Sequence, residues 1–159
     1  MNKRRAPRRL LGPGSDDVMW SLMRAAQAVE AQLEGALAEV DLSGPKFAAL
    51  THLVEAGEPV SLGELAAQCA CVRSNITQLV DRLEAEKMVR RVDDPADRRS
   101  LRAAITPLGR TRQAMGAKKV GQVRRKLSKA LGAIDHVALK RGTELLHAGM
   151  RKPRGGKQD

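Results

Sequence analysis

Short polar and basic side chains share one predicted helix face between residues 73 and 82. Their amide, guanidinium and hydroxyl groups are those that pair with base edges in the major groove, amides with adenine and arginine with guanine. Asn75 and Gln78 are therefore predicted adenine readers, and Arg73 is predicted to contact guanine or a phosphate. Ser74 and Thr77 are short donors suited to phosphates or to a thymine methyl contact, and Arg82, near the far end of the helix, is predicted to hold the DNA backbone.

A charged hairpin is predicted directly after this helix. Two short strand-like segments, 88–92 and 101–105, flank a loop rich in aspartate and arginine. Arg99, at the tip of the loop, is predicted to enter the minor groove of DNA, where the negative potential is strongest. Asp97 is predicted to orient either Arg99 or its neighbour Arg98. A groove-reading helix beside an arginine-tipped hairpin indicates a winged helix and therefore a DNA-binding protein.

The elements that must position these side chains carry clear local signals. Ser61 and Glu64 have the spacing of a capping box, in which each side chain accepts a hydrogen bond from the other residue's amide. This pattern predicts the first helix of a helix-turn-helix, with its turn at residues 69–71. Apolar residues of the second helix recur at i, i+3, i+4 and i+7, opposite the polar face. They are Ile76, Leu79, Val80 and Leu83.

Long amphipathic stretches lie on both sides of this module. Ser15 is a predicted helix cap, a second helix is predicted from Gly44-Pro45 to Gly57, and a third begins at Thr106-Pro107. Gly132 is predicted to break the third helix before a last one at 137–150. Apolar seams without a partner inside one subunit predict a homodimer interface built from both chain ends. The seams are Leu22, Ala26, Val29, Leu33, Ala36 and Val40, and Val120, Val123, Leu127, Leu131 and Ile134.

These elements predict a mainly helical fold with a small β-wing. The winged helix-turn-helix DNA-binding module is flanked by N- and C-terminal dimerisation helices. The predicted parts are a basic arm at 1–14, N-terminal helices for dimerisation and support at 15–57, the DNA-binding module at 58–106, C-terminal dimerisation helices at 107–150 and a disordered basic tail at 151–159.

The positive charge of the chain is localised. Residues 1–14 carry +5, residues 15–64 carry −7, residues 65–150 carry +10 and residues 151–159 carry +3, for a formal net charge of +11. The excess thus begins with the predicted helix-turn-helix. A localised basic surface is the electrostatic footprint of a nucleic-acid partner. The five cations of the arm (Lys3, Arg4, Arg5, Arg8 and Arg9) are predicted to add phosphate or minor-groove contacts.

Several classes of protein are excluded by what the sequence lacks. It contains no apolar run of membrane-spanning length and no apolar signal-peptide core, so we expect no membrane partner and a cytoplasmic, nucleoid-associated protein. No nucleophile with a base, phosphate-binding glycine loop or pair of catalytic carboxylates is present, which predicts no enzymatic activity and no cofactor. The three histidines lack metal-ligand spacing, so no metal site is predicted: His52, His136 and His147.

An ordered run of motifs in this sequence closely resembles the MarR family of bacterial and archaeal transcription regulators. The run extends over about 50 residues with essentially no gap, and the wing together with the motif Leu-Val-Asp-Arg-Leu-Glu is its specific part. The matching segments are Glu64–Ala66, Ile76–Glu84, Val89–Arg91, Asp93–Ser100 and Ile105–Gly109.

The resemblance implies an obligate homodimer with interlocked terminal helices above two winged helices. Such proteins usually bind an imperfect palindrome at a promoter, most often as repressors, and many release DNA when a small ligand occupies a cleft between the dimer helices and the DNA-binding module. We therefore expect an operator-binding repressor released by a small-molecule effector. Met19, Trp20 and Met23, near Phe47, are most simply core residues. As the aromatic-rich corner of the chain, Trp20, Met23 and Phe47 are also the candidate lining of the effector cleft, with Arg24 as the candidate partner of an anionic ligand.

The sequence departs from the family pattern at a few positions. Val72 stands where Ser or Thr usually caps the recognition helix, at a cost of about 1 kcal/mol. Lys87 stands where glycine commonly ends that helix with positive φ. The last helices contain glycines that each cost roughly 0.5–1 kcal/mol relative to alanine if they are interior: Gly116, Gly121, Gly132 and Gly142.

Two alternatives to an effector-released regulator remain. Cys69 and Cys71 align with buried Leu and Val of the family, which favours a role as small hydrophobes, yet oxidation there would distort the recognition helix and make the protein redox-responsive. A sequence-tolerant architectural DNA-binding protein would also use the basic arm and tail. A recognition helix rich in Asn, Gln, Ser and Thr favours specific reading instead, because a nonspecific binder needs only cations there.

Overall fold

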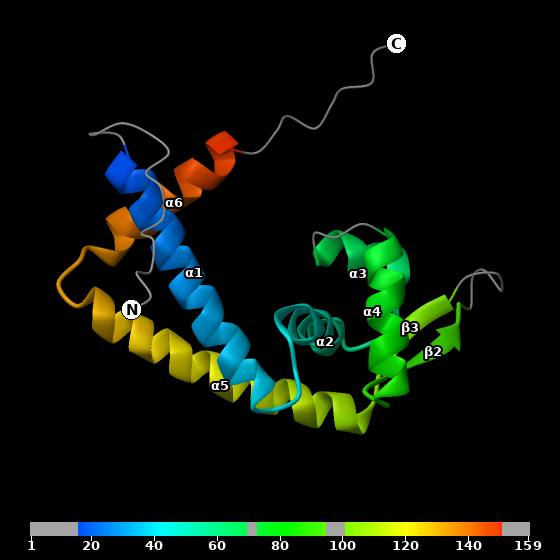
Figure 1. The fold of residues 1–159 in the computed structure, drawn as a ribbon. Helices are drawn as coiled ribbons and strands as arrows, with labels where there is room; N and C mark the ends of the chain where they lie inside the picture. The colour runs from blue at the N-terminus through cyan, green and yellow to red at the C-terminus, as the bar shows by residue number, and fades with distance from the viewer. Residues whose placement is uncertain (1–15, 70–72, 95–100, 151–159) are drawn as a thin grey trace, which may run out of the picture. The chain divides into compact units, whose positions relative to one another are not determined.

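The computed structural model describes residues 16–69, 73–94 and 101–150 (Figure 1). They form α1 (Asp16–Ala38), α2 (Gly44–Ala56), β1 (Val60–Ser61), α3 (Leu62–Gln68), α4 (Arg73–Ala85), β2 (Val89–Asp93), β3 (Leu101–Ile105), α5 (Pro107–Leu131) and α6 (His136–Met150). The chain divides into two compact units after Val123, within α5. The predicted fold class, mainly helical with a small β-wing, is confirmed.

The helix boundaries follow from residues that can adopt the required backbone. Pro45 begins α2, where its missing amide has no helical partner to lose, and Gly57 ends that helix with φ of 72°. Gly132 follows α5 with φ of 43°. Lys87, after α4, has φ of 60° although it carries a side chain, as its place in the glycine-favouring position predicted. Two seam residues, Val40 and Ile134, lie just beyond the ends of α1 and α5.

The core of the first unit lies where α2, α3, α4 and the sheet meet. Leu50, Leu53 and Leu65 are fully buried there, as are Ile76, Val80 and Leu83 on one side of α4. The helical spacing of the last three residues therefore identified the buried face of α4 correctly. Leu79 is half-buried and packs against the same core.

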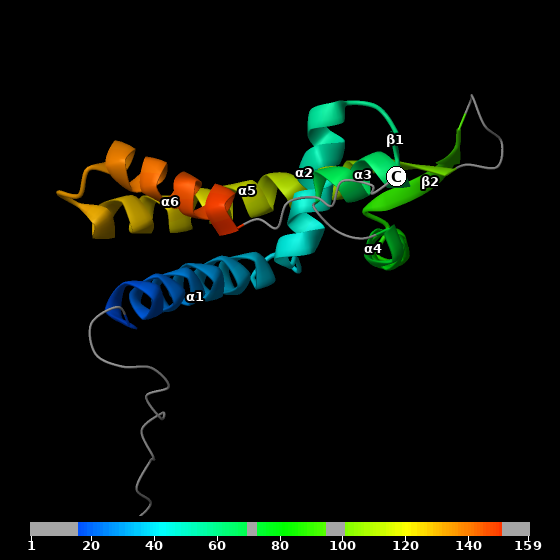
Figure 2. The ribbon, with the colours of Figure 1, turned by 90° about the horizontal axis from the view of Figure 1, so that it is seen from above.

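The wing is part of a three-stranded antiparallel sheet with the order β1–β3–β2. β2 and β3 pair in register from Val89 opposite Ile105 to Asp93 opposite Leu101. The short β1, which the sequence did not predict, adds to the other edge of β3 with Val60 opposite Ala103. Figures 1 and 2 show α4 beside the β2–β3 hairpin, so the sheet fixes the helix and the wing to each other.

Gly116 corrects the expectation that the C-terminal glycines only weaken their helix. It is buried in α5, and a Cβ atom there would lie 2.7 Å from Cδ2 of Phe47 and 2.9 Å from Cδ1 of Leu42. Since real Cβ contacts are rarely so short, the absence of a side chain at Gly116 allows α5 to pack closely against α2. Close packing thus offsets the cost of a helical glycine at this position.

Candidate nucleic-acid interface

The exposed side of α4 presents the predicted DNA-reading residues. Asn75, Thr77, Gln78 and Arg82 are exposed, opposite the buried side of the helix. Arg73 and Ser74 begin α4, while the described side chains start at Asn75. The structure therefore brings four of the six predicted helix residues onto one accessible surface, which is the arrangement that reading of the major groove requires.

The capping box predicted at Ser61 holds the start of α3. The Ser61 hydroxyl accepts a hydrogen bond from the Glu64 amide at 3.2 Å, and the Glu64 carboxylate accepts one from the Ser61 amide at 3.0 Å. These hydrogen bonds with Ser61 hold the pKa of Glu64 below its usual value. Leu65 and Ala66 are then buried one turn later, so α3 is fixed as the support on which α4 rests.

The base of the wing is held by an ion pair that the sequence analysis did not single out. Arg102 Nε donates to Asp94 Oδ2 at 2.8 Å, and Arg102 Nη1 donates to the carbonyl oxygen of Pro59 at 3.2 Å. Asp94 is only 8% exposed, and its carboxylate raises the pKa of Arg102. The sequence signal that could have identified this ion pair was the presence of two opposite charges, Asp94 and Arg102, in one predicted hairpin. The predicted wing-tip residues, Asp97, Arg98 and Arg99, lie outside the described residues.

Arg91 is a second residue that the sequence analysis missed. It lies on β2, where its guanidinium contacts Asp81 and Glu84 of α4, each at 2.5 Å. Its own amide donates to Oε1 of Glu84 at 3.0 Å. Three hydrogen bonds thus join the wing to the second half of the recognition helix. The spacing of seven and ten residues across a turn gave no local signal for this contact.

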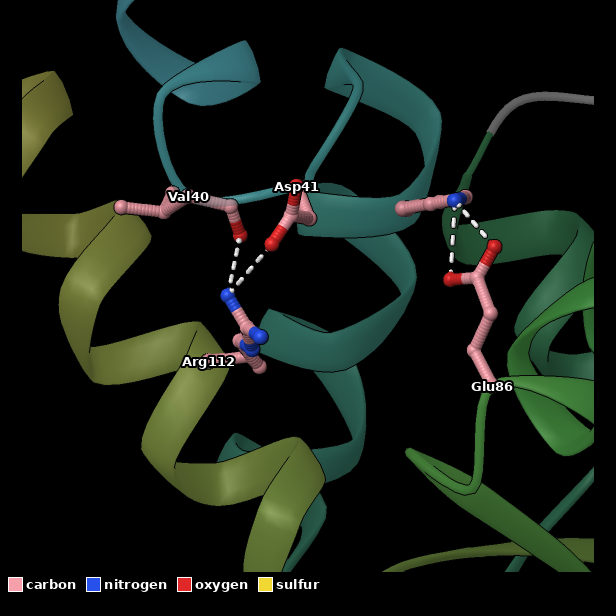
Figure 3. Close-up of polar contacts among 5 residues, drawn as sticks. Val40, Asp41, Glu86 and Arg112 are labelled. Carbon is pink, nitrogen blue, oxygen red and sulfur yellow. Dashed lines mark hydrogen bonds and ion pairs between the residues drawn. The ribbon is translucent and has the colours of Figure 1, made fainter.

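Two ion pairs connect α2 to the residue that follows α4, and α5 to the segment that joins α1 to α2 (Figure 3). Lys46 donates to both carboxylate oxygens of Glu86, at 2.6 and 2.8 Å. Arg112 of α5 donates to the Val40 carbonyl oxygen at 3.2 Å and to Asp41 Oδ2 at 2.9 Å. The end of the recognition helix is therefore linked to α2, and the first half of α5 is linked to the end of α1.

The protomer does not bring the four residues of the predicted effector cleft together. Trp20, Met23 and Arg24 lie in the first half of α1, whereas Phe47 lies near the start of α2 against Gly116. The start of α2 contacts Glu34, whose Oε1 accepts a hydrogen bond from the Gly44 amide. Trp20 lies about 21 Å before Glu34 along α1. The expectation that Met19 and Met23 belong to the core is wrong for the protomer, since both are exposed, whereas Phe47 packs against the core.

Cys69 is the cysteine that the structure describes. Cys69 ends α3, is half-buried and packs against the core, while Cys71 lies outside the described residues. Among the residues that the structure describes, no three His, Cys, Asp or Glu side chains are grouped to hold a metal ion. Within the same residues, no helix is both long enough and apolar enough to cross a bilayer.

Comparison with known proteins relates this site to a known family. Residues 40–100, which contain α2, the helix-turn-helix and most of the wing, match the MarR family. The chain is 33% identical over 93 residues to the uncharacterized HTH-type transcriptional regulator YsmB of Bacillus subtilis. That alignment covers 58% of this chain and 63% of YsmB, less than two thirds of the relative's length.

Two solved structures show the same fold over nearly the whole chain. Sco3205, a MarR family regulator from Streptomyces coelicolor solved in complex with DNA, has a TM-score of 0.78 at 24% identity, covering 95% of this chain and 97% of that one. CouR from Rhodococcus jostii, solved with p-coumaroyl-CoA, has a TM-score of 0.71 at 25% identity, covering 91% of this chain and 100% of CouR. The chain is thus similar to the MarR family over residues 40–100 and shares the fold of these two solved proteins.

Proposed function

We propose that this protein regulates transcription by binding a palindromic operator in double-stranded DNA as a homodimer, most simply as a repressor. The observation that carries the proposal is the two-sided character of α4. Its apolar side is fully buried at Ile76, Val80 and Leu83, while the side that carries Asn75 and Gln78 is exposed. Exposed amides next to a hairpin suit direct reading of adenine in the major groove.

The exposed apolar residues of the outer helices support the proposed homodimer. In the first half of α1, Val18 is 69% exposed, and Met19, Leu22 and Met23 are also exposed. No residue of α6 is buried, and Val137 and Met150 are 77% and 83% exposed. Soluble proteins rarely leave such apolar helix faces uncovered. A second copy of the chain would cover both faces with one symmetric interface.

Release by a small molecule is the proposed mode of control. CouR was solved with p-coumaroyl-CoA bound, and a further relative of the same fold, BpsR of Bordetella bronchiseptica, is described as regulated in DNA binding by 6-hydroxynicotinic acid. Since the protomer separates Trp20 from Phe47, an effector cleft that used both residues would have to include surface from the second copy. Effector binding is therefore proposed to depend on dimerisation.

The test is a comparison of two duplexes. Purified full-length protein is titrated with the DNA upstream of its own gene and with a scrambled duplex of equal length, at 50 and 200 mM salt. We expect a preference of about 10³-fold or more for the upstream DNA, within the range of specific binders, and a dimer in light scattering. Equal affinities that both fall steeply with salt would contradict operator reading and favour an architectural DNA-binding protein.

A further inference from the structure

Arg91 of β2 links the recognition helix to the wing through ion pairs with α4. Its two guanidinium nitrogens contact Asp81 and Glu84 on successive turns of α4, and its amide donates to Glu84 as well. The side chain is 22% exposed, so neighbouring atoms limit its freedom. A planar guanidinium held by two carboxylates fixes direction as well as distance.

The charges of this cluster bear directly on a DNA-facing surface. Asp81 is exposed and lies one turn after Gln78 on the same side of α4. An unpaired carboxylate there would repel DNA phosphates across a short distance. Arg91 neutralises that charge, and hydrogen bonding to Asp81 raises the pKa of Arg91 above its usual value.

The position of Asp81 on α4 determines which side chains would be displaced if the contact with Arg91 were lost. Asp81 is six residues after Asn75, which corresponds to about 9 Å along the helix axis. The same end of α4 is held to α2 through Glu86 and Lys46. A change of tilt at Asp81 would displace the amides of Asn75 and Gln78 while the core contacts of Ile76 and Val80 remain. Base reading by bidentate amides depends on such placement.

We propose that Arg91 is a positioning residue for operator reading, which orients the recognition helix against the wing and neutralises Asp81 without itself contacting DNA. The inference rests on the proposed function, because it concerns the reading of an operator. Under this proposal β2 contributes to sequence specificity through Arg91, in addition to the exposed residues of α4.

The experiment compares Arg91→Met with Arg90→Met in the full-length protein. Arg90 is the exposed neighbour on the same strand, so both variants lose one positive charge from β2. Each is titrated with operator and scrambled duplexes at two salt concentrations, after circular dichroism has confirmed equal folding. We expect Arg91→Met to lower the operator preference about tenfold, equivalent to about 1.4 kcal/mol, and Arg90→Met to leave the preference within about twofold.

Two further variants keep the test decisive if Arg91→Met folds poorly. Arg91→Lys retains the charge but loses the two-carboxylate contact, and we expect it to restore only part of the preference. Arg91→Met combined with Asp81→Asn has the net charge of the wild type, so its salt dependence should match the wild type while its operator preference stays low.

The possible results separate this inference from the function on which it rests. A wild type that prefers its operator, together with an Arg91→Met variant that retains the full preference, would overturn the inference alone. The slope of log affinity against log salt concentration could instead fall by about 0.9 in the charge-matched double variant. That result would mean that Arg91 itself contacts a phosphate, and it would also overturn the inference. A wild type without any operator preference would overturn the proposed function and this inference together.

Discussion

Gly109 lies directly against the backbone of Met88. A Cβ atom on Gly109 would be 2.1 Å from the Met88 carbonyl oxygen, a distance at which no side chain fits. This contact joins the first turn of α5 to the residue that precedes β2. Thr106 reinforces the same junction, since its hydroxyl lies 2.7 Å from the Lys87 carbonyl oxygen and accepts a hydrogen bond from the Gly109 amide at 3.0 Å.

Gly109→Ala should therefore destabilise the protein by more than about 2 kcal/mol, in the upper part of the range for overpacked sites. The backbone of Met88 is held in the sheet and cannot withdraw as a flexible side chain would. Urea unfolding followed by circular dichroism measures the change. Gly63→Ala is the control, because the nearest atom to its Cβ position is 4.0 Å away. Equal stability of the two variants would contradict the close approach.

Lys87→Gly should stabilise the protein by about 0.5–1 kcal/mol. Lys87 has φ of 60°, and left-handed backbone costs an L-residue roughly 1–2 kcal/mol. Glycine avoids this cost but loses more conformational entropy on folding, so the net gain in folding stability is smaller. Chemical denaturation of Lys87→Gly and Lys87→Ala separates the backbone effect from the loss of charge. If the alanine variant gains as much stability as the glycine variant, the backbone explanation is wrong.

Glu64 should make the stability of the helix-turn-helix sensitive to acid. Its folded pKa lies below the usual glutamate value of 4.5 because of the hydrogen bonds with Ser61. A lowered pKa stabilises the fold above the unfolded value, and that contribution is lost as pH falls through the folded value. The stability difference between wild type and Glu64→Gln should therefore shrink as pH falls below 4.5. Denaturation midpoints between pH 7 and 3 measure it, and a constant difference would refute the linkage.

Gln78 and Arg82 should differ in what they contribute to DNA binding. Gln78→Ala is expected to cost about 1–3 kcal/mol of operator affinity while the salt dependence stays unchanged, because an amide reads a base edge. Arg82→Ala should weaken binding to operator and scrambled duplexes alike and lower the slope of log affinity against log salt concentration by about 0.9, because we expect its guanidinium to contact a phosphate. Fluorescence anisotropy titrations over a salt series distinguish the two. Identical effects of both substitutions would contradict these roles.

Much of the fold is encoded in local sequence signals. Ser61 and Glu64 specify the start of α3 through contacts within one helical turn. The spacing of Ile76, Val80 and Leu83 identified the buried side of α4, and thereby the exposed side that carries Asn75 and Gln78. Such predictions succeed because helix periodicity converts residue spacing directly into a face.

Contacts that join distant segments of the chain leave no such local signal. β1 has only two residues and becomes a strand because it pairs with β3, more than forty residues later. The placement of Phe47 beside Trp20 was wrong because both were grouped by residue type, whereas the length of α1 separates them. Gly116 was interpreted as a cost because its close neighbours, Leu42 and Phe47, lie about seventy residues earlier in the chain.

The sequence by itself therefore determined the candidate recognition helix, the side that it exposes and the resemblance to the MarR family. Only the tertiary structure decided how that helix is held. Arg91 reaches Asp81 and Glu84 across the turn between α4 and β2, and Gly109 meets Met88 where α5 begins. The physical reason is that periodicity and capping act within one or two helical turns, while ion pairs and close backbone contacts depend on how complete elements pack.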